Sequence, residues 1–478
     1  MKYKLDKTHT HIENIPYEEY IRKQDIPENS YLITDYGART DGDFASNRKA
    51  MQTAIDAAFN NGGGIVLVSG GNYKCANIEL KSNITLFISA DSSLENITYD
   101  EDRTENKAYT KKSNGFIFAK NARNVRITGG GKLIGNGETY TKEPSCKEVY
   151  YPLESFSVGE HYRQFKKRIR LGRCHEKNRY YMLELEDCEN CSVQNLIITD
   201  AGSWTCRMKA CADSTVSDVV IDNNLHVANS DGIDILGGKN IRIEHCFIAT
   251  GDDGACLKTE DGSGEIDGVT VRNCEIMSNA SAFKIGTGTY NNISNVTVEN
   301  CSFFIAEMAG GYCGISIEAV DGGTVRDVAV KNISMENVVC PFLIWLGKRH
   351  GKSHMMNITL KDISAKNIDM TPSIVGSKGM LAENIKISNV DVTYRNCGEA
   401  LDIFKGDSCA RFFNVYSYPE SINVSKLGGK RYDLPCYGLF VVHVDVCLEN
   451  YRVEPRECNK RQKFNIEFAP DCHQCIKV

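Results

Sequence analysis

The stretch Val269-Thr270-Val271-Arg272-Asn273-Cys274 returns one repeat later as Val296-Thr297-Val298-Glu299-Asn300-Cys301. Both stretches alternate apolar and polar residues and then reach an asparagine, which is typical of a half-buried β-strand that ends in a turn. Further copies begin at Cys191, Val219, Ile241, Val328, Ile358 and Ile385. The shortest step runs from Val219 to Ile241 and the longest from Val296 to Val328, and a period of this size predicts a parallel β solenoid.

The composition of the repeats separates two kinds of solenoid. A leucine-rich repeat would be rich in leucine and would carry helices, whereas these units are rich in Val and Ile, with Gly, Asn and Asp between them. The recurrent asparagine suits a turn, and copies in successive coils can form a hydrogen-bonded ladder. We therefore predict an all-β fold, a parallel β-helix.

The repeats lie inside a longer chain of 478 residues. We expect an N-terminal extension over residues 1–30, a β-helix domain over 31–425 and the final coils with the C-terminal closure over 426–478.

One helix is predicted before the repeats. Its apolar face is formed by Ala50, Met51, Ala54, Ile55, Ala58 and Phe59, and Gly62-Gly63-Gly64 ends it. An exposed strand row at a solenoid end needs a cover, so this helix is predicted to be the N-terminal cap.

An insertion at about residues 139–178 interrupts the rhythm. It carries a basic run made of Arg163, Lys166, Lys167, Arg168, Arg170 and Arg173. Such a run is usually a solvated face, and the alternative is a loop beside the cleft that contacts an anionic substrate or phosphate.

The overall composition excludes several classes of protein. A net charge of −6 gives no general attraction to nucleic acid or anionic membranes, and no segment approaches about 18 consecutive apolar residues. The polar N-terminus has no apolar core of signal-peptide length, so we expect a cytoplasmic protein with reduced thiols among its 20 cysteines. The pairs Cys188/Cys191 and Cys472/Cys475 are expected to pack rather than to bind zinc. We expect no metal and no cofactor, and the sequence leaves the oligomeric state open.

Two acidic motifs carry the chemistry. They are Asn229-Ser230-Asp231-Gly232 and Gly251-Asp252-Asp253-Gly254. The offset between Asp231 and Asp253 equals the step from Val219 to Ile241, so we expect the two side chains to stack at the strand spacing of about 4.8 Å. Acidic groups in so small a volume cannot all remain ionised without a large energetic penalty, and a proton shared among them would make the acid and base that glycosidic cleavage needs.

At these motifs the chain resembles glycoside hydrolase family 28, the polygalacturonase family. The resemblance covers roughly residues 30 to 420 and includes Tyr36-Gly37-Ala38 and the run Gly129-Gly130-Gly131-Lys132-Leu133. It implies a right-handed parallel β-helix and an inverting glycosidase. Asp252 would be the general acid, and Asp231 and Asp253 would hold and deprotonate the attacking water. Inversion needs the acid and the base to be ~6.5–9.5 Å apart.

Two further family motifs are altered. The family's Gly-His-Gly falls on Ala280-Ser281-Ala282, so Ser281 stands where a histidine is usual. The family's Arg-Ile-Lys falls on Ser316-Ile317-Glu318. Those cations normally hold galacturonate carboxylates, which Glu318 would repel, so we expect a neutral or deoxy sugar at the cleaved end.

Several other residues are candidates for substrate binding. Lys284 could pair with Glu318 or tune an aspartate, or it could be an exposed strand lysine. His226 could replace the missing histidine, although a turn histidine is the alternative, and Trp204 could stack on a sugar or fill the core. The remaining candidates are Asn229 of the first motif, Lys258, and Arg349 in a loop with Lys348 and His350.

The sequence supports three functions. The first is an exo-acting glycoside hydrolase of imported oligosaccharides or glycosides. The second is a polysaccharide lyase or epimerase on the same fold, which would neutralise a uronate with a cation, often calcium. The third is a carbohydrate-binding solenoid without catalysis, which retention of all three aspartates argues against.

Overall fold

The computed structural model describes residues 2–8, 10–102, 108–109, 115–141, 179–260, 262–306, 313–368, 370–377, 379–394, 402–403, 432–433, 436–454 and 473–477. The basic run predicted at residues 163–173 and Cys472 therefore lie outside the described residues. Contacts group the chain into two compact units. The N-terminal unit comprises Asp6–Lys147 and Arg170–Asp252, and the C-terminal unit comprises Met1–Leu5, Glu148–Ile169 and Asp253–Val478.

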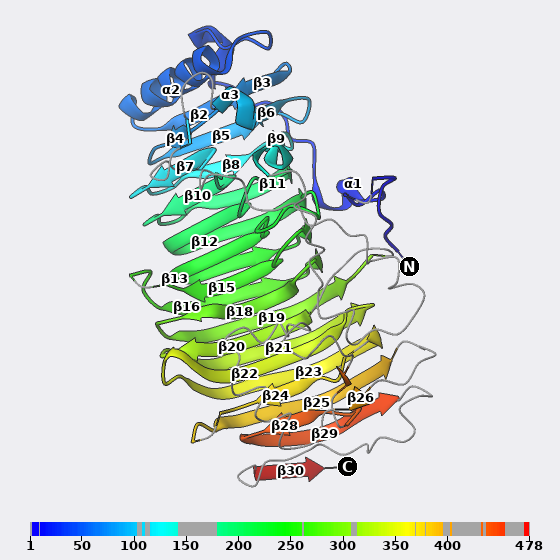
Figure 1. Cartoon of the computed structure of the whole chain (residues 1–478). Helices are drawn as coiled ribbons and strands as arrows, with labels where there is room; N and C mark the ends of the chain where they lie inside the picture. Colours follow the sequence, from blue (N-terminus) through cyan, green and yellow to red (C-terminus); the bar gives the residue numbers. More distant parts are fainter. Residues whose placement is uncertain are drawn as a thin grey trace. The chain divides into compact units, whose positions relative to one another are not determined.

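The N-terminal unit is built from parallel strands with few helices (Figure 1). Its helices are α1 (Tyr17–Tyr20), α2 (Phe44–Asn60) and α3 (Tyr99–Glu101), with the 3-10 turns η1 (Ile33–Tyr36) and η3 (Gly137–Tyr140). Its described strands are β1 (Tyr31–Leu32), β2 (Gly64–Val68), β3 (Asn72–Cys75), β4 (Ile78–Leu80), β5 (Ile84–Ile88), β6 (Ser93–Asn96), β7 (Ile117–Lys120), β8 (Arg126–Thr128), β9 (Lys132–Ile134), β10 (Leu183–Glu186), β11 (Ser192–Thr199), β12 (Cys206–Asp222), β13 (Ile233–Glu244) and β14 (Phe247–Thr250).

Three parallel ladders run through this unit. The first joins β4, β7, β10, β12 and β13. The second joins β1, β2, β5, β8, β11 and β12, and the third joins β3, β6, β9 and β11. From β2 to β10, successive described strands enter the second, third and first ladders in turn, which is the architecture of a parallel β-helix, as predicted.

The C-terminal unit continues the same plan. Its described strands are β15 (Ala255–Thr259), β16 (Ile266–Arg272), β17 (Glu275–Ser278), β18 (Ser281–Thr289), β19 (Ile293–Phe304), β20 (Cys313–Asp321), β21 (Thr324–Glu336), β22 (Cys340–Gly351), β23 (His354–Ile368), β24 (Ser373–Val375), β25 (Ala382–Tyr394), β26 (Asp402–Ile403), β27 (Tyr432–Asp433), β28 (Phe440–Val442), β29 (Val444–Glu454) and β30 (His473–Lys477). One ladder joins β15, β18, β20, β22, β24 and β28, and another joins β16, β19, β21, β23, β25, β29 and β30.

The recurrent asparagine sits at the predicted turn. Asn273, Asn300 and Asn389 have φ values of 55°, 56° and 53°, in the left-handed region that asparagine tolerates. The side-chain amide of Asn389 donates to Asp362 at 2.8 Å and accepts from Asn450 at 3.0 Å. The turn and the ladder are therefore both present, and they hold successive coils in register.

One copy of the repeat is misplaced in the sequence-based alignment. Val216 pairs with Ile243, and Val220 pairs with Phe247, so the two steps are equal and both are longer than the step from Val219 to Ile241. The copy equivalent to Ile241-Arg242-Ile243 is Ser214-Thr215-Val216, whose alternation is hidden because two of its three residues are polar. The prediction that Asp231 stacks on Asp253 relied on the short step from Val219 to Ile241. The strand pairing shows that Val219 and Ile241 are not equivalent, so that step is not a repeat of the fold.

Helix α2 forms where its apolar periodicity predicts it. Asp43 caps its N-terminus by accepting the N–H of Ser46 at 2.8 Å. Five of the six predicted apolar residues are buried, but Phe59 is 41% exposed, beneath the ammonium of Lys81. The prediction is wrong for Phe59, because it lies at the end of the helix.

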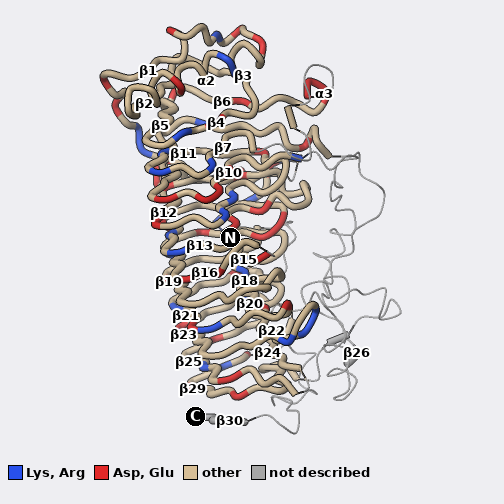
Figure 2. Tube along the Cα trace, turned by 90° about the vertical axis from the view of Figure 1, so that its left-hand side faces the viewer, with Lys and Arg blue, Asp and Glu red and all other residues tan. Residues whose placement is uncertain are grey.

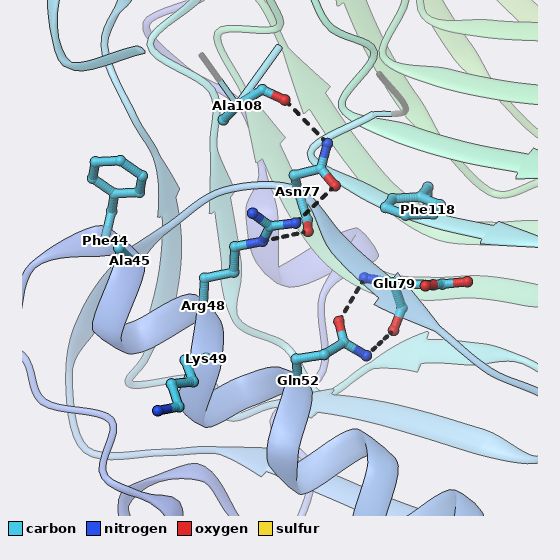
Figure 3. A pocket seen from close by; sticks show the side chains of 9 residues that line it. All are labelled: Phe44, Ala45, Arg48, Lys49, Gln52, Asn77, Glu79, Ala108 and Phe118. Atoms are coloured by element: carbon cyan, nitrogen blue, oxygen red, sulfur yellow. Dashed lines mark hydrogen bonds between the residues drawn. The ribbon is translucent and has the colours of Figure 1, made fainter. Parts of the chain in front are cut away.

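Side chains of α2 cover backbone groups at the start of the first ladder (Figure 3). The amide of Gln52 both donates to and accepts from the backbone of Glu79, each at 3.2 Å. Arg48 donates through Nε to the carbonyl of Asn77 at 3.2 Å. A pocket of about 510 Å³ opens between these residues and contains none of the predicted site residues.

Acidic and basic residues are interspersed along the described coils (Figure 2). Within the described residues, no helix has the length and apolar character needed to cross a bilayer.

Candidate active site

Asp231 ends a tight turn between β12 and β13. Asn229 begins the turn in the left-handed conformation, with a φ of 59°. The Ser230 hydroxyl is fully buried and accepts the N–H of Gly251 at 3.1 Å. The Asp231 carbonyl accepts the N–H of Thr205 at 2.8 Å. These bonds hold the turn rigidly and leave Asp231 only 2% exposed.

Asp252 follows β14 in the next turn. A Cβ atom at Gly251 would lie 2.4 Å from the carbonyl oxygen of Val227, so the turn accepts only glycine at this position. The Oδ2 atom of Asp252 accepts the backbone N–H of Asn229 at 3.0 Å. Asp252 is half-buried, in contrast to the buried Asp231, and it can therefore be reached from solvent.

The carboxylates of Asp231 and Asp252 lie close together. One oxygen of each lies within 4.8 Å of the other. This bound joins one oxygen of each carboxylate, whereas the ~6.5–9.5 Å expected for an inverting acid and base separates the two carboxyl groups. Adjacent coils of a β-helix are about 4.8 Å apart, so carboxylates on neighbouring turns can bring one oxygen of each this close. The two oxygens repel when both groups are charged, and a proton or a hard divalent cation between them would relieve the repulsion.

Arg179 is a partner that the sequence analysis missed. Its Nη2 donates to the side-chain oxygen of Asn229 at 2.8 Å, and its Nη1 donates to the carbonyl of Ala228. It lies far before Asn229 in the chain, directly after the insertion, and no local pattern marks it.

Asp253 is the next residue after Asp252 and opens the C-terminal unit. Its Oδ1 accepts the backbone N–H of Ser281 at 3.2 Å. A Cβ atom at Gly254 would lie 2.6 Å from the carbonyl oxygen of Ala282, so the second glycine of this motif also reflects close packing of coils. Asp253 is 5% exposed.

Lys284 lies between two carboxylates. Its Nζ is 3.3 Å from Oδ2 of Asp253 and 4.0 Å from Oε1 of Glu318. The Ser316 hydroxyl donates to the same Glu318 oxygen at 2.9 Å. The three charged side chains are at most 6% exposed, so their attraction is screened far less than that of a surface pair. Lys284 is therefore a buried counter-ion and not an exposed strand lysine.

Ser281 is the residue predicted to stand where the family has a histidine. It is fully buried, and its Oγ has no hydrogen-bond partner among the described residues. Its contact with Asp253 is through the backbone and would be available to any residue at this position except proline.

His226 and Lys258 are both half-buried. The N–H of His226 donates to the side-chain oxygen of Asn224 at 3.0 Å, so His226 lies in a turn. Lys258 lies in β15. Their contributions to substrate binding stay predictions.

Trp204 is half-buried and stacks on Tyr181, with ring centroids 5.5 Å apart and planes at 28°. The guanidinium of Arg207 lies 5.1 Å from the Tyr181 ring. Tyr181 was not predicted, because it is distant from Trp204 in the sequence and only the register of the coils brings the two rings together.

Arg349 lies in β22, so the expectation of a loop at Lys348–His350 is wrong. Its Nε and Nη2 bind both carboxylate oxygens of Asp321, at 2.7 and 2.5 Å. Burial alone would raise the pKa of Asp321, but hydrogen bonds from Arg349 and the Thr289 N–H outweigh it and lower that pKa. The substrate-binding prediction for Arg349 must therefore be weighed against a structural ion pair.

Comparisons with known proteins agree with this geometry. A family model described as glycosyl hydrolases family 28 matches residues 65–409. A polygalacturonase of Malus domestica is 25% identical over 392 residues, which cover 80% of this chain and 74% of that protein. An exopolygalacturonase of Platanus acerifolia is 22% identical over 77% of this chain and 91% of its own length. A polygalacturonase of Persea americana is 25% identical, and this chain spans 62% of its length.

Solved structures show the same fold. The family 28 exopolygalacturonase of Yersinia enterocolitica superposes with a TM-score of 0.64 at 16% identity, over 96% of this chain and 78% of that one. The exopolygalacturonase of Thermotoga maritima superposes with a TM-score of 0.61 at 19% identity, over 79% and 90%.

Proposed function

This chain belongs to glycosyl hydrolases family 28, and from that premise we propose that it is an inverting, exo-acting hydrolase whose substrates carry a neutral or deoxy sugar at the cleaved end. Its membership makes it a glycoside hydrolase that acts on O-glycosyl bonds. The inverting outcome, the exo mode and the sugar class are the parts that we propose.

The proposed roles follow the exposure of the three aspartates. Asp252 is the most accessible of them and would protonate the leaving oxygen, which arrives with the substrate. Asp231 and Asp253 are 2% and 5% exposed and would hold and deprotonate the attacking water. Asn229 would orient Asp252 through its N–H. Inversion is proposed from family membership, because the approach of Asp231 and Asp252 alone would suit a retaining pair equally well.

The observation that carries the sugar class is the buried cluster of Asp253, Lys284 and Glu318. Two carboxylates and one ammonium leave the cluster with a formal charge of −1 when all are ionised. Another carboxylate about 4 Å from Glu318 would meet a repulsion of roughly 4 kcal/mol at an effective dielectric constant of 20. Lys284 is already bound by two carboxylates, so it offers a uronate little compensation. A neutral or deoxy sugar would meet no such repulsion.

The exo mode and the cellular setting rest on separate arguments. The Platanus relative is an exopolygalacturonase, and this chain spans 91% of its length. Nearly all of the cysteines whose side chains the structure describes are buried, and buried small side chains of this kind suit a reducing compartment. We therefore propose a cytoplasmic enzyme that meets imported oligosaccharides or glycosides, with Trp204, His226, Lys258, Ser281 and Arg349 as further contributors to the substrate site.

Two features of the fold also belong to this proposal. The β-helix would be right-handed, as parallel crossover connections nearly always are. Helix α2 would be its N-terminal cap, because Gln52 and Arg48 bind backbone groups of Glu79 and Asn77 that would otherwise face water.

Comparing substrate classes tests the proposal. Purified protein is assayed on oligogalacturonates, on neutral and deoxy oligosaccharides, and on aryl glycosides. We expect hydrolysis of a neutral or deoxy substrate and little activity on oligogalacturonate, with Glu318→Gln raising the relative rate on the uronate. A preference of the wild-type protein for oligogalacturonate would overturn the sugar class, and it is the competing outcome because the curated relatives are polygalacturonases.

Two further outcomes would move the protein to another class. An unsaturated product, abolished by a chelator, would identify a lyase. Binding of an oligosaccharide by both the wild type and Asp252→Asn, without turnover, would identify a carbohydrate-binding solenoid.

A further inference from the structure

We propose that Arg179 is a positioning residue, which holds the turn at Asn229 so that its N–H points at the carboxylate of Asp252. This inference rests on the proposed function, in which Asp252 is the general acid. The influence of Arg179 on Asp252 passes through Asn229, which contacts both residues. All three residues lie in the N-terminal unit.

The guanidinium binds the turn at two points. Nη2 donates to the side-chain oxygen of Asn229 at 2.8 Å, and Nη1 donates to the carbonyl of Ala228, the preceding residue. A guanidinium is planar and presents its donors in a fixed fork, so two simultaneous bonds define the orientation of the peptide between them. A lysine ammonium is a single point of attachment and could not define that orientation.

The clamp acts on a residue in a left-handed conformation. Asn229 has a φ of 59°, which asparagine tolerates, so the two bonds of Arg179 orient the turn and do not relieve strain. Both acceptors of Arg179 are neutral oxygens, one on either side of the N–Cα bond of Asn229, so the contacts form a clamp on the backbone. On the other side of the same residue, the Asn229 N–H donates to Oδ2 of Asp252 at 3.0 Å. Rotation of the peptide before Asn229 would turn this N–H away from the carboxylate.

Loss of the clamp has a kinetic signature. A misplaced general acid lowers kcat, and small displacements of catalytic groups can reduce rates by up to about a hundredfold. KM should change little, because Arg179 is not proposed to touch the substrate.

The test compares Arg179→Gln and Arg179→Lys with Arg123→Gln as the control. Arg123 is an exposed arginine of the same unit, paired with Glu189. We expect both Arg179 variants to lose at least about tenfold in kcat, with KM within about twofold. The Arg123 variant should match the wild type. The double variant Arg179→Gln/Asn229→Ala should lose no more than the larger single loss, because both changes break one chain of contacts.

Each alternative result overturns the proposal. A raised KM with unchanged kcat would make Arg179 a substrate contact. Full rescue by lysine would reduce its role to charge, and additive losses in the double variant would separate it from Asn229.

A readout without substrate separates this inference from the proposed function. Hydrogen exchange of the peptide that covers residues 228–231 should accelerate in Arg179→Gln while the melting temperature and the exchange of β13 stay near wild type. Unchanged exchange of that peptide would refute the positioning role whether or not the protein hydrolyses any substrate tested. Inactivity of the wild type on all substrates, together with accelerated exchange, would refute the proposed function alone.

Discussion

At the scale of single residues, neighbouring aspartates differ in their surroundings. Asp252 is half-buried and receives an N–H from Asn229, whereas Asp253 is buried beside the ammonium of Lys284. A carboxylate next to a buried cation is favoured in its ionised form, as a base must be, and an accessible one can deliver a proton to an arriving oxygen.

These differences predict distinct losses on substitution. Asp252→Asn should lower kcat by about 10²-fold or more while substrate binding stays nearly unchanged, because general-acid catalysis contributes factors of that size. Asp231→Asn and Asp253→Asn should be severely impaired as well. Steady-state kinetics and calorimetric binding measure this, with the exposed Asp25→Asn as the control. Near wild-type rates in all three variants would refute the assignment.

Arg349 allows structural and substrate-binding roles to be separated. Removal of one partner from a buried ion pair leaves an uncompensated charge, so Arg349→Ala should lower the free energy of unfolding by about 3 kcal/mol. The lowered pKa of Asp321 adds stability at neutral pH that is lost as the pH falls through its folded-state pKa. The stability gap between wild type and variant should therefore shrink below about pH 4.

Urea titrations across pH check this, with Lys348→Ala, an exposed neighbour, as the control. A variant of unchanged stability with a strongly raised KM would return Arg349 to the substrate site.

The sequence predicted the acidic motifs and the possibility that Lys284 pairs with an aspartate or with Glu318. It could not predict Arg179 or Tyr181. Their partners, Asn229 and Trp204, are distant in the sequence, and only the stacking of coils brings them close. Local patterns carry no information about such contacts.

At the scale of elements, the turn between strands determines register. The left-handed residue recurs at Asp218, His245, Asn273 and Asn300, although only two of these are asparagine. Aligning the repeats on asparagine places the turn of one copy at Asn223 instead of Asp218. That copy of the repeat is therefore misplaced. The correct copy has no apolar alternation to mark it, because Ser214 and Thr215 are both polar.

The asparagine ladder predicts a graded effect on stability. Asn389→Ala loses the bonds to Asp362 and Asn450 and also forces alanine into a left-handed conformation. Asn389→Gly loses the same bonds without that strain, so the alanine variant should be the less stable by roughly 0.5–1 kcal/mol. Chemical denaturation measures the difference. Equal stabilities, or a more stable alanine variant, would show that backbone conformation does not govern this turn.

At the scale of the whole molecule, the repeat period predicted the solenoid, but not how the N-terminal extension is held. In the N-terminal unit, residues 10–12 bind the end of β12, the turn that follows it, and Asp200, which follows β11. The carbonyl of Thr10 accepts the N–H of Leu225 at 2.9 Å, and His11 Nε2 lies 3.0 Å from Asp200. These polar contacts have no repeat and no apolar periodicity, so the sequence gives no sign of them.

His11 makes this attachment dependent on pH. Burial opposes its protonation, but the hydrogen bond to Asp200 and the charges of Asp222, Asp200 and Asp6 outweigh it and raise the pKa of His11 to about 9. A raised histidine pKa contributes stability fully below about pH 6.5 and loses it as the pH rises through about 9.

The unfolding free energy should therefore fall between those pH values, and His11→Gln should flatten that part of the profile. Exposed His354→Gln serves as the control. A slope that persists in His11→Gln would assign the pH dependence to another group.

The central claim is an inverting glycoside hydrolysis by Asp231, Asp252 and Asp253, and the stereochemistry of the first product tests it most directly. Proton NMR of the hydrolysis mixture, recorded before mutarotation, reports the configuration of the newly formed reducing end. We predict an anomer opposite to that of the cleaved bond. Retained configuration would contradict the claim, and it would instead agree with the close approach of the Asp231 and Asp252 oxygens.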